Sequence, residues 1–212
     1  MKKPLIGLVD TGTSNIKSVN YALQECGAEV LQISNIDQNN NVDGIVVPGI
    51  GNFKFVMDKL KKEKLDKLIL EKTNLNLPSL FICVGMQILF SESSELGVSK
   101  GLGVFKGKVK KIANEIKGSK HKRNVPFIGW NKIIKMKNCK IFEKIPTNNF
   151  FYFTHSYYAD PVDQSIISTK VNYFDLNYCS SVSKNNIFAT QFHPEKSAKN
   201  GLKIYENFLN LL

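Results

Sequence analysis

The chain has 212 residues, of which 42% are hydrophobic, and it carries a formal net charge of +11. This length and composition predict one globular domain, residues 1–212, with a substantial core. No apolar run approaches the ~20 residues that cross a bilayer, and the first residues lack the pattern of a cleavable signal. We therefore expect a cytoplasmic protein that acts away from membranes.

The positive charge comes almost entirely from lysine, because Arg123 is the single arginine among 29 basic residues. Proteins that read nucleic acids usually rely on arginine for bidentate and stacking contacts, so we expect no nucleic-acid partner. The lysines are interpreted as solvated surface residues, with Lys117–Arg123 as an exposed basic loop. Steering of a phosphorylated small molecule toward a partner is the alternative. The four cysteines lack the spacing of a disulfide framework, which indicates reduced thiols.

The first half of the chain alternates between strand and helix patterns. Strands are expected at Leu5–Val9, Ala28–Ile33 and Gly44–Val47, with a helix after Asn15 and lysine-rich helices up to Thr73. This alternation predicts an α/β fold with a doubly wound, mostly parallel sheet and helices on both faces. Sites in such sheets lie at the carboxyl ends of the strands, where Asp10–Ser14, Pro48–Asn52 and Cys83 would meet.

The second half is rich in short strand patterns instead. The expected strands are Val104–Ile112, Lys132–Met136, Phe150–Tyr158, Ser165–Lys170, Cys179–Ser183 and Ile187–Gln191. They predict an antiparallel β extension, followed by a closing helix from Ser197.

Cys83 ends the apolar run 78–82 and is followed by Val84-Gly85-Met86-Gln87, a helical pattern. A sharp turn from strand to helix that exposes one reactive side chain is the arrangement of a nucleophile elbow. Backbone N–H groups at the start of such a helix can stabilise a thiolate and an oxyanion. A cysteine in an apolar strand is more often a plain core residue, so the turn chemistry carries this interpretation.

His193 and Glu195 are separated by one proline. In an extended segment, residues i and i+2 point the same way, so Glu195 can orient the imidazole of His193 as a base for Cys83. A zinc site built from these three residues is the alternative, but the spacing lacks the paired ligands of known zinc motifs. We predict acyl transfer at a thiol, with no metal and no cofactor.

Several further segments complete a family resemblance over the whole chain. They include 47–53 (Val-Pro-Gly-Ile-Gly-Asn-Phe), 125–131 (Val-Pro-Phe-Ile-Gly-Trp-Asn), 152–158 (Tyr-Phe-Thr-His-Ser-Tyr-Tyr) and 191–197 (Gln-Phe-His-Pro-Glu-Lys-Ser). With the elbow at Cys83, the sequence resembles the glutaminase subunits of imidazole glycerol phosphate synthase, which are class I (triad) glutamine amidotransferases.

The resemblance implies a role for each matching residue. Cys83, His193 and Glu195 would be the catalytic triad that hydrolyses glutamine through a thioester. The remaining implied residues are Val84, Gly49, Ile50 and Gly51 for the oxyanion hole; Gln87, Glu95, His155 and Ser156 for substrate binding, with Glu92 competing for the role of Glu95; and Asn15, Trp130, Tyr152 and Lys196 for interface or gating.

Phe81 departs from the family pattern, which usually has glycine two residues before the nucleophile. A ring at this position must point away from the elbow or be accommodated by a local shift. We still interpret the site as active.

The resemblance also implies a partner, because a chain that only releases ammonia needs an acceptor enzyme docked over its site. That partner would be a (β/α)8 barrel cyclase, forming a heterodimer that makes imidazole glycerol phosphate in histidine biosynthesis. Two alternatives keep the same motifs. One is a paralogue that supplies ammonia to an acetamidino-sugar pathway for surface polysaccharide, and the other is a degenerate, non-catalytic subunit.

Overall fold

A computed structural model of the chain describes residues 2–12, 15–38 and 41–212, so part of the loop expected at Asp10–Ser14 lies outside the described residues. Its centre is a nine-stranded sheet. In spatial order, the strands are β2 (Glu29–Ile33), β1 (Leu5–Val9), β3 (Gly44–Val47), β4 (Ser79–Ile82), β13 (Ile187–Thr190), β12 (Leu176–Lys184), β11 (Ile167–Tyr173), β8 (Phe127–Lys135) and β9 (Phe150–His155). The strands from β2 to β13 run parallel, and those from β13 to β9 pair antiparallel. The predicted α/β fold is confirmed.

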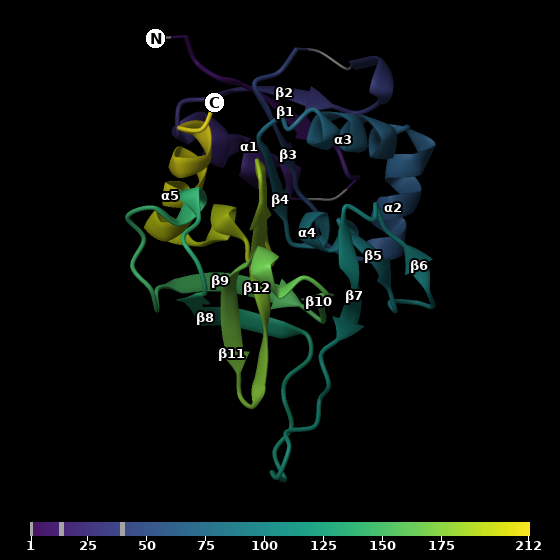
Figure 1. Ribbon diagram of the computed structural model, residues 1–212, viewed down its shortest axis with the longest axis vertical. Helices are drawn as coiled ribbons and strands as arrows, with labels where there is room; N and C mark the ends of the chain where they lie inside the picture. Colours follow the sequence, from purple (N-terminus) through teal and green to yellow (C-terminus); the bar gives the residue numbers. More distant parts are fainter. Residues whose placement is uncertain (1, 13–14, 39–40) are drawn as a thin grey trace.

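Helices cover both faces of the parallel strands. Figure 1 shows α1 (Ile16–Glu25) and α5 (Ala198–Leu209) on one side and α2 (Phe53–Lys62) and α3 (Leu65–Asn74) on the other. Strands β3 and β4 are buried along their whole length, which explains their continuous apolar sequences. Within the described residues, the short 3₁₀ turns are Ile36–Gln38, Lys140–Phe142, Gln164–Ile166 and Pro194–Lys196.

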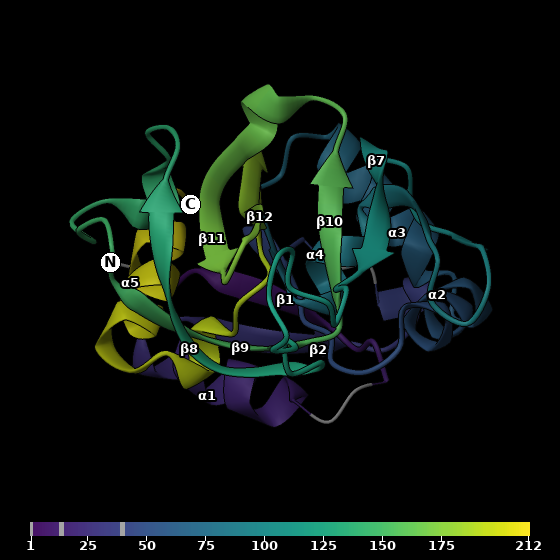
Figure 2. The same cartoon turned by 90° about the horizontal axis from the view of Figure 1, so that it is seen from below.

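A second, smaller sheet stands beside the main one. Its strand order is β10 (Tyr157–Pro161), β7 (Phe105–Lys111), β5 (Phe90–Ser93) and β6 (Ser99–Lys100). The sequence predicted one strand at Phe150–Tyr158, but the run breaks at Ser156, so that β9 joins the main sheet and β10 the second sheet. Figure 2 shows β7 and β10 side by side at a distance from β8 and β9.

The predicted basic loop lies between β7 and β8 and extends from the body at the end opposite both termini (Figure 1). Its lysines are exposed, but Arg123 is buried, which corrects the expectation for this residue. The Arg123 guanidinium donates to the carbonyl of Ala113 at 2.8 Å, to the carbonyl of Tyr173 at 3.2 Å and to the Asp175 carboxylate. The lone arginine therefore anchors the base of the loop.

Within the residues that the structure describes, no helix combines the length and the apolar character needed to cross a membrane. The same residues contain no group of three or more His, Cys, Asp or Glu side chains arranged to hold a metal ion.

Phe81 lies in β4 between Val47 of β3 and Ala189 of β13, and its side chain has no exposed surface. The ring is therefore part of the core, and the chain still makes its sharp turn two residues later.

Replacing Phe81 by glycine should remove this packing and lower the free energy of unfolding by about 3 kcal/mol or more, without raising catalytic turnover. Urea unfolding and a steady-state assay measure the two effects. Phe174→Gly is the matched control, because Phe174 is 60% exposed and has a left-handed backbone (φ 59°) that glycine adopts freely. A faster Phe81→Gly enzyme would show that the ring distorts the elbow.

Candidate active site

Cys83 occupies a strained turn between β4 and the short helix α4 (Val84–Ile88). Its backbone has φ 56° and ψ −108°, a left-handed conformation that non-glycine residues rarely adopt. The Cys83 N–H donates to the Thr190 carbonyl of β13 at 2.7 Å, which ties the turn to the neighbouring strand. Gly85 makes the turn possible, because a Cβ there would lie 2.1 Å from the Val47 carbonyl oxygen. The predicted nucleophile elbow is present in geometry.

His193 and Glu195 meet directly below this turn. His193 Nδ1 lies 2.8 Å from Glu195 Oε1, and both side chains are fully buried. The 3₁₀ turn Pro194–Lys196 brings them together, whereas the sequence argument assumed extended backbone. Burial alone favours the neutral imidazole, but the adjacent Cys83 sulfur and the Glu195 carboxylate outweigh it and raise the pKa of His193 above its ordinary value.

Glu195 has further support from Asn15, at the start of α1. Asn15 Nδ2 donates to Glu195 Oε1 at 3.0 Å, and Asn15 is 4% exposed. Burial opposes ionisation of Glu195, but the contacts with His193 and Asn15 outweigh it and lower the pKa of this carboxyl. Behind it, burial and then the charge of Glu195 raise the pKa of the Tyr205 phenol. Asn15, expected at an interface or gating position, lies in the interior beside the Glu195 carboxylate.

The expected oxyanion hole is closed in this structure. The Val84 N–H donates to the Gly49 carbonyl oxygen, with 3.3 Å between nitrogen and oxygen. The two chain segments touch here, since a Cβ on Gly49 would lie 3.0 Å from the Gly85 nitrogen. Gly51, two residues on, has φ +99° and open space around its Cα, and Ile50 between them is half-buried. The donor expected for an oxyanion is therefore engaged by the Gly49–Gly51 loop.

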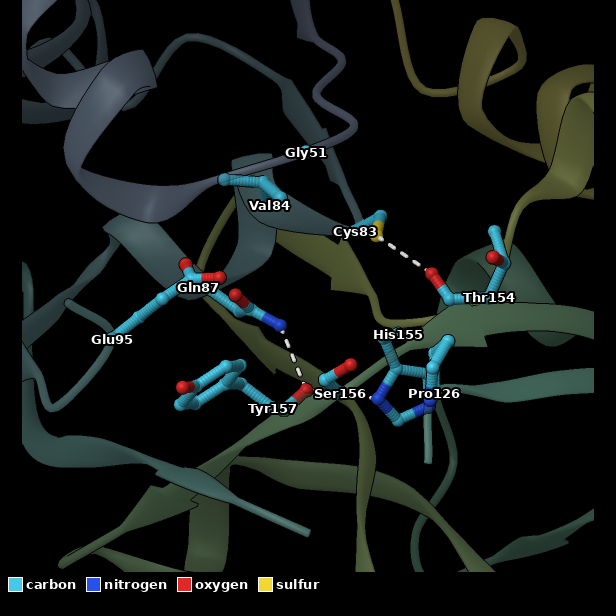
Figure 3. A pocket seen from close by; sticks show the side chains of 10 residues that line it. All are labelled: Gly51, Cys83, Val84, Gln87, Glu95, Pro126, Thr154, His155, Ser156 and Tyr157. Carbon is cyan, nitrogen blue, oxygen red and sulfur yellow. Dashed lines mark hydrogen bonds between the residues drawn. The ribbon is translucent and has the colours of Figure 1, made fainter. Parts of the chain in front are cut away.

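A cavity of about 210 Å³ opens at the Cys83 sulfur. Figure 3 shows Cys83 and Val84 on one side of it, Gln87 and Glu95 on a second, and His155, Ser156 and Tyr157 on a third. All four residues expected to bind the substrate, Gln87, Glu95, His155 and Ser156, thus line one cavity with the expected nucleophile.

Glu95 and Glu92 were both candidates for the acidic position of the pocket. Glu95 lines the cavity, where its Oε2 accepts from the Phe53 N–H at 2.7 Å. Glu92 is instead paired with Lys108 at 2.8 Å and does not belong to the cavity lining. The geometry favours Glu95.

The His155 side chain is fixed from both ring nitrogens. Nδ1 lies 2.8 Å from the Tyr157 carbonyl oxygen, and Nε2 lies 3.0 Å from the Tyr178 hydroxyl. Burial lowers the pKa of His155 to about 4, so the ring is neutral at neutral pH. The ring therefore holds the 155–157 backbone in place along the cavity wall.

Three of the residues expected at an interface or in gating form one group near Glu195: Trp130, Tyr152 and Lys196. Trp130 and Tyr152 are cross-strand partners of β8 and β9, with ring centroids 5.9 Å apart. Lys196 Nζ lies 6.0 Å from the centre of the Tyr152 ring. Trp130 is 50% exposed, so a large aromatic surface is accessible beside the site.

Sequence reasoning missed Gln191 as a site residue. It is fully buried, and its Nε2 lies 3.6 Å from the Cys83 sulfur. The i, i+2 argument applied to His193 and Glu195 would also have placed Gln191, two residues before His193, on the side of the nucleophile. The Thr154 carbonyl, which accepts from the sulfur at 4.0 Å, carries no signal in the sequence.

Comparison with known proteins agrees with this geometry. The family profile described as "Glutamine amidotransferase class-I" matches residues 7–211. "Imidazole glycerol phosphate synthase subunit HisH" of Pyrococcus furiosus is 44% identical over 97% of this chain and 98% of its own length. The protein of the same name from Methanocaldococcus jannaschii is 41% identical over 98% and 100%. Among solved structures, PurLQS from Thermotoga maritima superposes with a TM-score of 0.75 at 19% identity, over 99% of each chain, a likeness of fold.

Gly85→Ala tests the elbow. The added methyl would collide with the Val47 carbonyl, so the turn must shift and glutamine turnover should fall about 10²–10³-fold as the oxyanion donor moves. Steady-state glutamate release by the folded variant, bound to its partner subunit, measures the loss. Gly97→Ala is the control: the positive φ of Gly97 (+93°) strains an alanine, but a Cβ there would meet no atom within 4 Å. Undiminished turnover in Gly85→Ala would contradict the close approach at the elbow.

Proposed function

Because the chain belongs to the class I glutamine amidotransferases, we propose that it is the glutaminase subunit of an imidazole glycerol phosphate synthase. The observation that carries the proposal is that the buried His193–Glu195 pair lies against Cys83, whose side chain lines the cavity. The names of the two curated relatives support the histidine pathway as the destination of the ammonia.

The proposed chemistry assigns a role to each triad member. The Cys83 thiolate attacks the side-chain carbonyl carbon of glutamine, a C–S bond forms, and the carbonyl oxygen becomes an oxyanion. His193 gives a proton to the leaving nitrogen, so the C–N bond breaks and ammonia departs from a glutamyl thioester. Water then attacks the thioester, His193 takes its proton, and glutamate leaves the regenerated thiol. Glu195 keeps Nδ1 of His193 protonated and the ring correctly oriented.

The closed oxyanion hole supports a gated enzyme. The Val84 N–H is the expected donor for the oxyanion, and it is held by the Gly49 carbonyl. Rotation of the peptide that follows Gly49 would release it, and the conformational freedom of Gly49 and Gly51 makes that rotation easy. We propose that binding of the partner and its nucleotide ligand drives this rotation.

The proposed partner is a (β/α)8 barrel cyclase, and the outer face of β8 and β9 is its proposed docking surface. Side chains on this face are apolar and exposed: Ile128 at 61%, Trp130 at 50% and Phe150 at 47%. Ammonia released into water at neutral pH becomes protonated and loses its nucleophilicity, so the site needs a cover. A face that is apolar and borders the triad meets that need.

The two alternatives stand as outcomes of the tests. An acetamidino-sugar paralogue would be stimulated by a different partner, and a degenerate subunit would show no glutamine turnover in any complex. We assign the complex to the cytoplasm, where the four free thiols would stay reduced.

Cys83→Ser should abolish glutamine-dependent synthesis by the complex and leave synthesis from added ammonium salt intact, because the acceptor site belongs to the partner. Both rates are measured with the same complex. A glutamine-analogue electrophile should label Cys83 and spare the other cysteines. For Cys26, burial and then Glu206 raise the pKa to about 11, and burial raises the pKa of Cys179 further. Glutamine-dependent turnover by Cys83→Ser would refute the assignment.

Gating predicts very slow glutamine hydrolysis by the isolated chain. Adding the cognate cyclase with its phosphorylated ribulosyl-formimino carboxamide ribonucleotide should stimulate hydrolysis at least 10²–10³-fold, the value of one oxyanion donor. The measurement is glutamate release by the chain alone, with cyclase, and with cyclase plus ligand. Equal rates in all three would favour a free-standing hydrolase, and stimulation only by a sugar-pathway partner would select the paralogue.

A further inference from the structure

Two buried side-chain amides connect the Cys83 sulfur to the Tyr157 carbonyl. Gln191 Nε2 donates to the Cys83 sulfur at 3.6 Å. Gln87 Nε2 donates to Gln191 Oε1 at 3.0 Å and to the Tyr157 carbonyl oxygen at 2.9 Å, the bond drawn beside Gln87 in Figure 3. Gln191 is fully buried and Gln87 is 3% exposed, so this chain of bonds is sheltered from water.

The direction of the chain follows from its last member. An amide side chain offers a nitrogen that donates and an oxygen that accepts, in nearly the same shape. The Tyr157 carbonyl can only accept, so the atom of Gln87 that faces it must be the nitrogen. The second hydrogen of that nitrogen then requires the oxygen of Gln191. The nitrogen of Gln191 therefore faces Cys83. In this way the Tyr157 carbonyl, acting through Gln87, fixes an N–H of Gln191 toward the sulfur.

The other groups around the sulfur indicate what this N–H does, which is to stabilise the thiolate form of Cys83. The helix α4 that follows Cys83 has five residues, so its dipole at the sulfur is weak. The Thr154 carbonyl accepts from the sulfur, which favours the protonated thiol, whereas the adjacent His193 imidazole favours the thiolate. A fixed N–H donor favours the thiolate, because a charged acceptor forms the stronger hydrogen bond.

We propose that Gln191 is a positioning residue that stabilises and orients the Cys83 thiolate, and that Gln87 holds the Gln191 amide in the donating orientation. Because Gln87 also lines the cavity, the residue expected to bind the substrate is joined to the nucleophile. The inference rests on the proposed role of Cys83 as the nucleophile.

The test is alkylation of Cys83 by iodoacetamide in the isolated chain, followed by site-resolved mass spectrometry between about pH 5 and 10. Gln191→Met keeps the length of the side chain and removes the donor. It should slow alkylation at neutral pH on the order of tenfold and move the midpoint of the profile to higher pH. Gln191→Glu keeps the shape of the side chain and adds a negative charge beside the sulfur. Because this charge repels a thiolate, alkylation should slow by more than in Gln191→Met.

Asn207→Leu is the matched control. The buried Asn207 amide donates to the carbonyls of Ile141 at 3.1 Å and Glu143 at 2.8 Å, away from Cys83. Asn207→Leu removes a buried amide and should lower the stability of the fold. The alkylation profile of Cys83 should nevertheless keep its wild-type midpoint. Alkylation losses that follow melting temperature across all variants, control included, would overturn the proposal.

Gln87→Met is a second test, and its result does not depend on how well the Gln191 variants fold. It frees the Gln191 amide to rotate, so alkylation should slow even though iodoacetamide has no amino-acid group to recognise. A wild-type profile in Gln87→Met, or in either folded Gln191 variant, overturns the proposal. This failure is distinct from failure of the proposed function, which would appear as glutamine turnover in Cys83→Ser.

Discussion

The Val84 N–H can serve one acceptor at a time, and in this structure its acceptor is the Gly49 carbonyl, 3.3 Å away. The bond exists because two glycines let the backbones approach. A side chain on Gly85 would strike the Val47 carbonyl, and one on Gly49 would press on the Gly85 nitrogen and the Val84 Cβ. The close packing of the two backbone segments that permits the sharp turn at Cys83 therefore also occupies the Val84 N–H. The sharp turn at Cys83 and the bond between Val84 and Gly49 thus have one physical origin.

The triad is assembled by the order of the sheet. Parallel strands β4 and β13 are neighbours, so their carboxyl ends deliver Cys83 and the segment of His193 to the same edge. The 3₁₀ turn after His193 returns Glu195 beneath the imidazole, and Asn15 reaches the same carboxylate from the start of α1. The buried Glu195 charge thus has two partners, which is what makes its burial tolerable.

The sequence predicted the parallel half of the fold well, because each strand there is a continuous apolar run between helices. It predicted the second half less well. The strand β5 has only four residues and no clear alternation, and β9 and β10 follow each other with one residue between, so local pattern cannot separate them. A tertiary contact lies at the break between them, where the buried His155 ring bonds to the Tyr178 hydroxyl of β12.

The sequence predicted those site residues that belong to a recognisable motif. Glu195 was paired with His193 on the assumption of an extended segment, whereas the segment forms a 3₁₀ turn. Asn15 and Gln191 illustrate what remained hidden. Asn15 meets Glu195 across 180 residues, a contact that only the folded chain reveals. Gln191 meets Cys83 across 108 residues, and its spacing from His193 was the one signal in the sequence.

The central claim is that the oxyanion donor exists but is occupied until the partner acts. A crystal structure of the complex with cyclase and nucleotide ligand, and with a glutamine analogue bound covalently to Cys83, tests it directly. The account predicts that the Gly49 carbonyl has turned away and that the analogue's oxygen lies about 2.7–3.1 Å from the Val84 nitrogen. A Gly49 carbonyl still bonded to Val84 in that complex would contradict it.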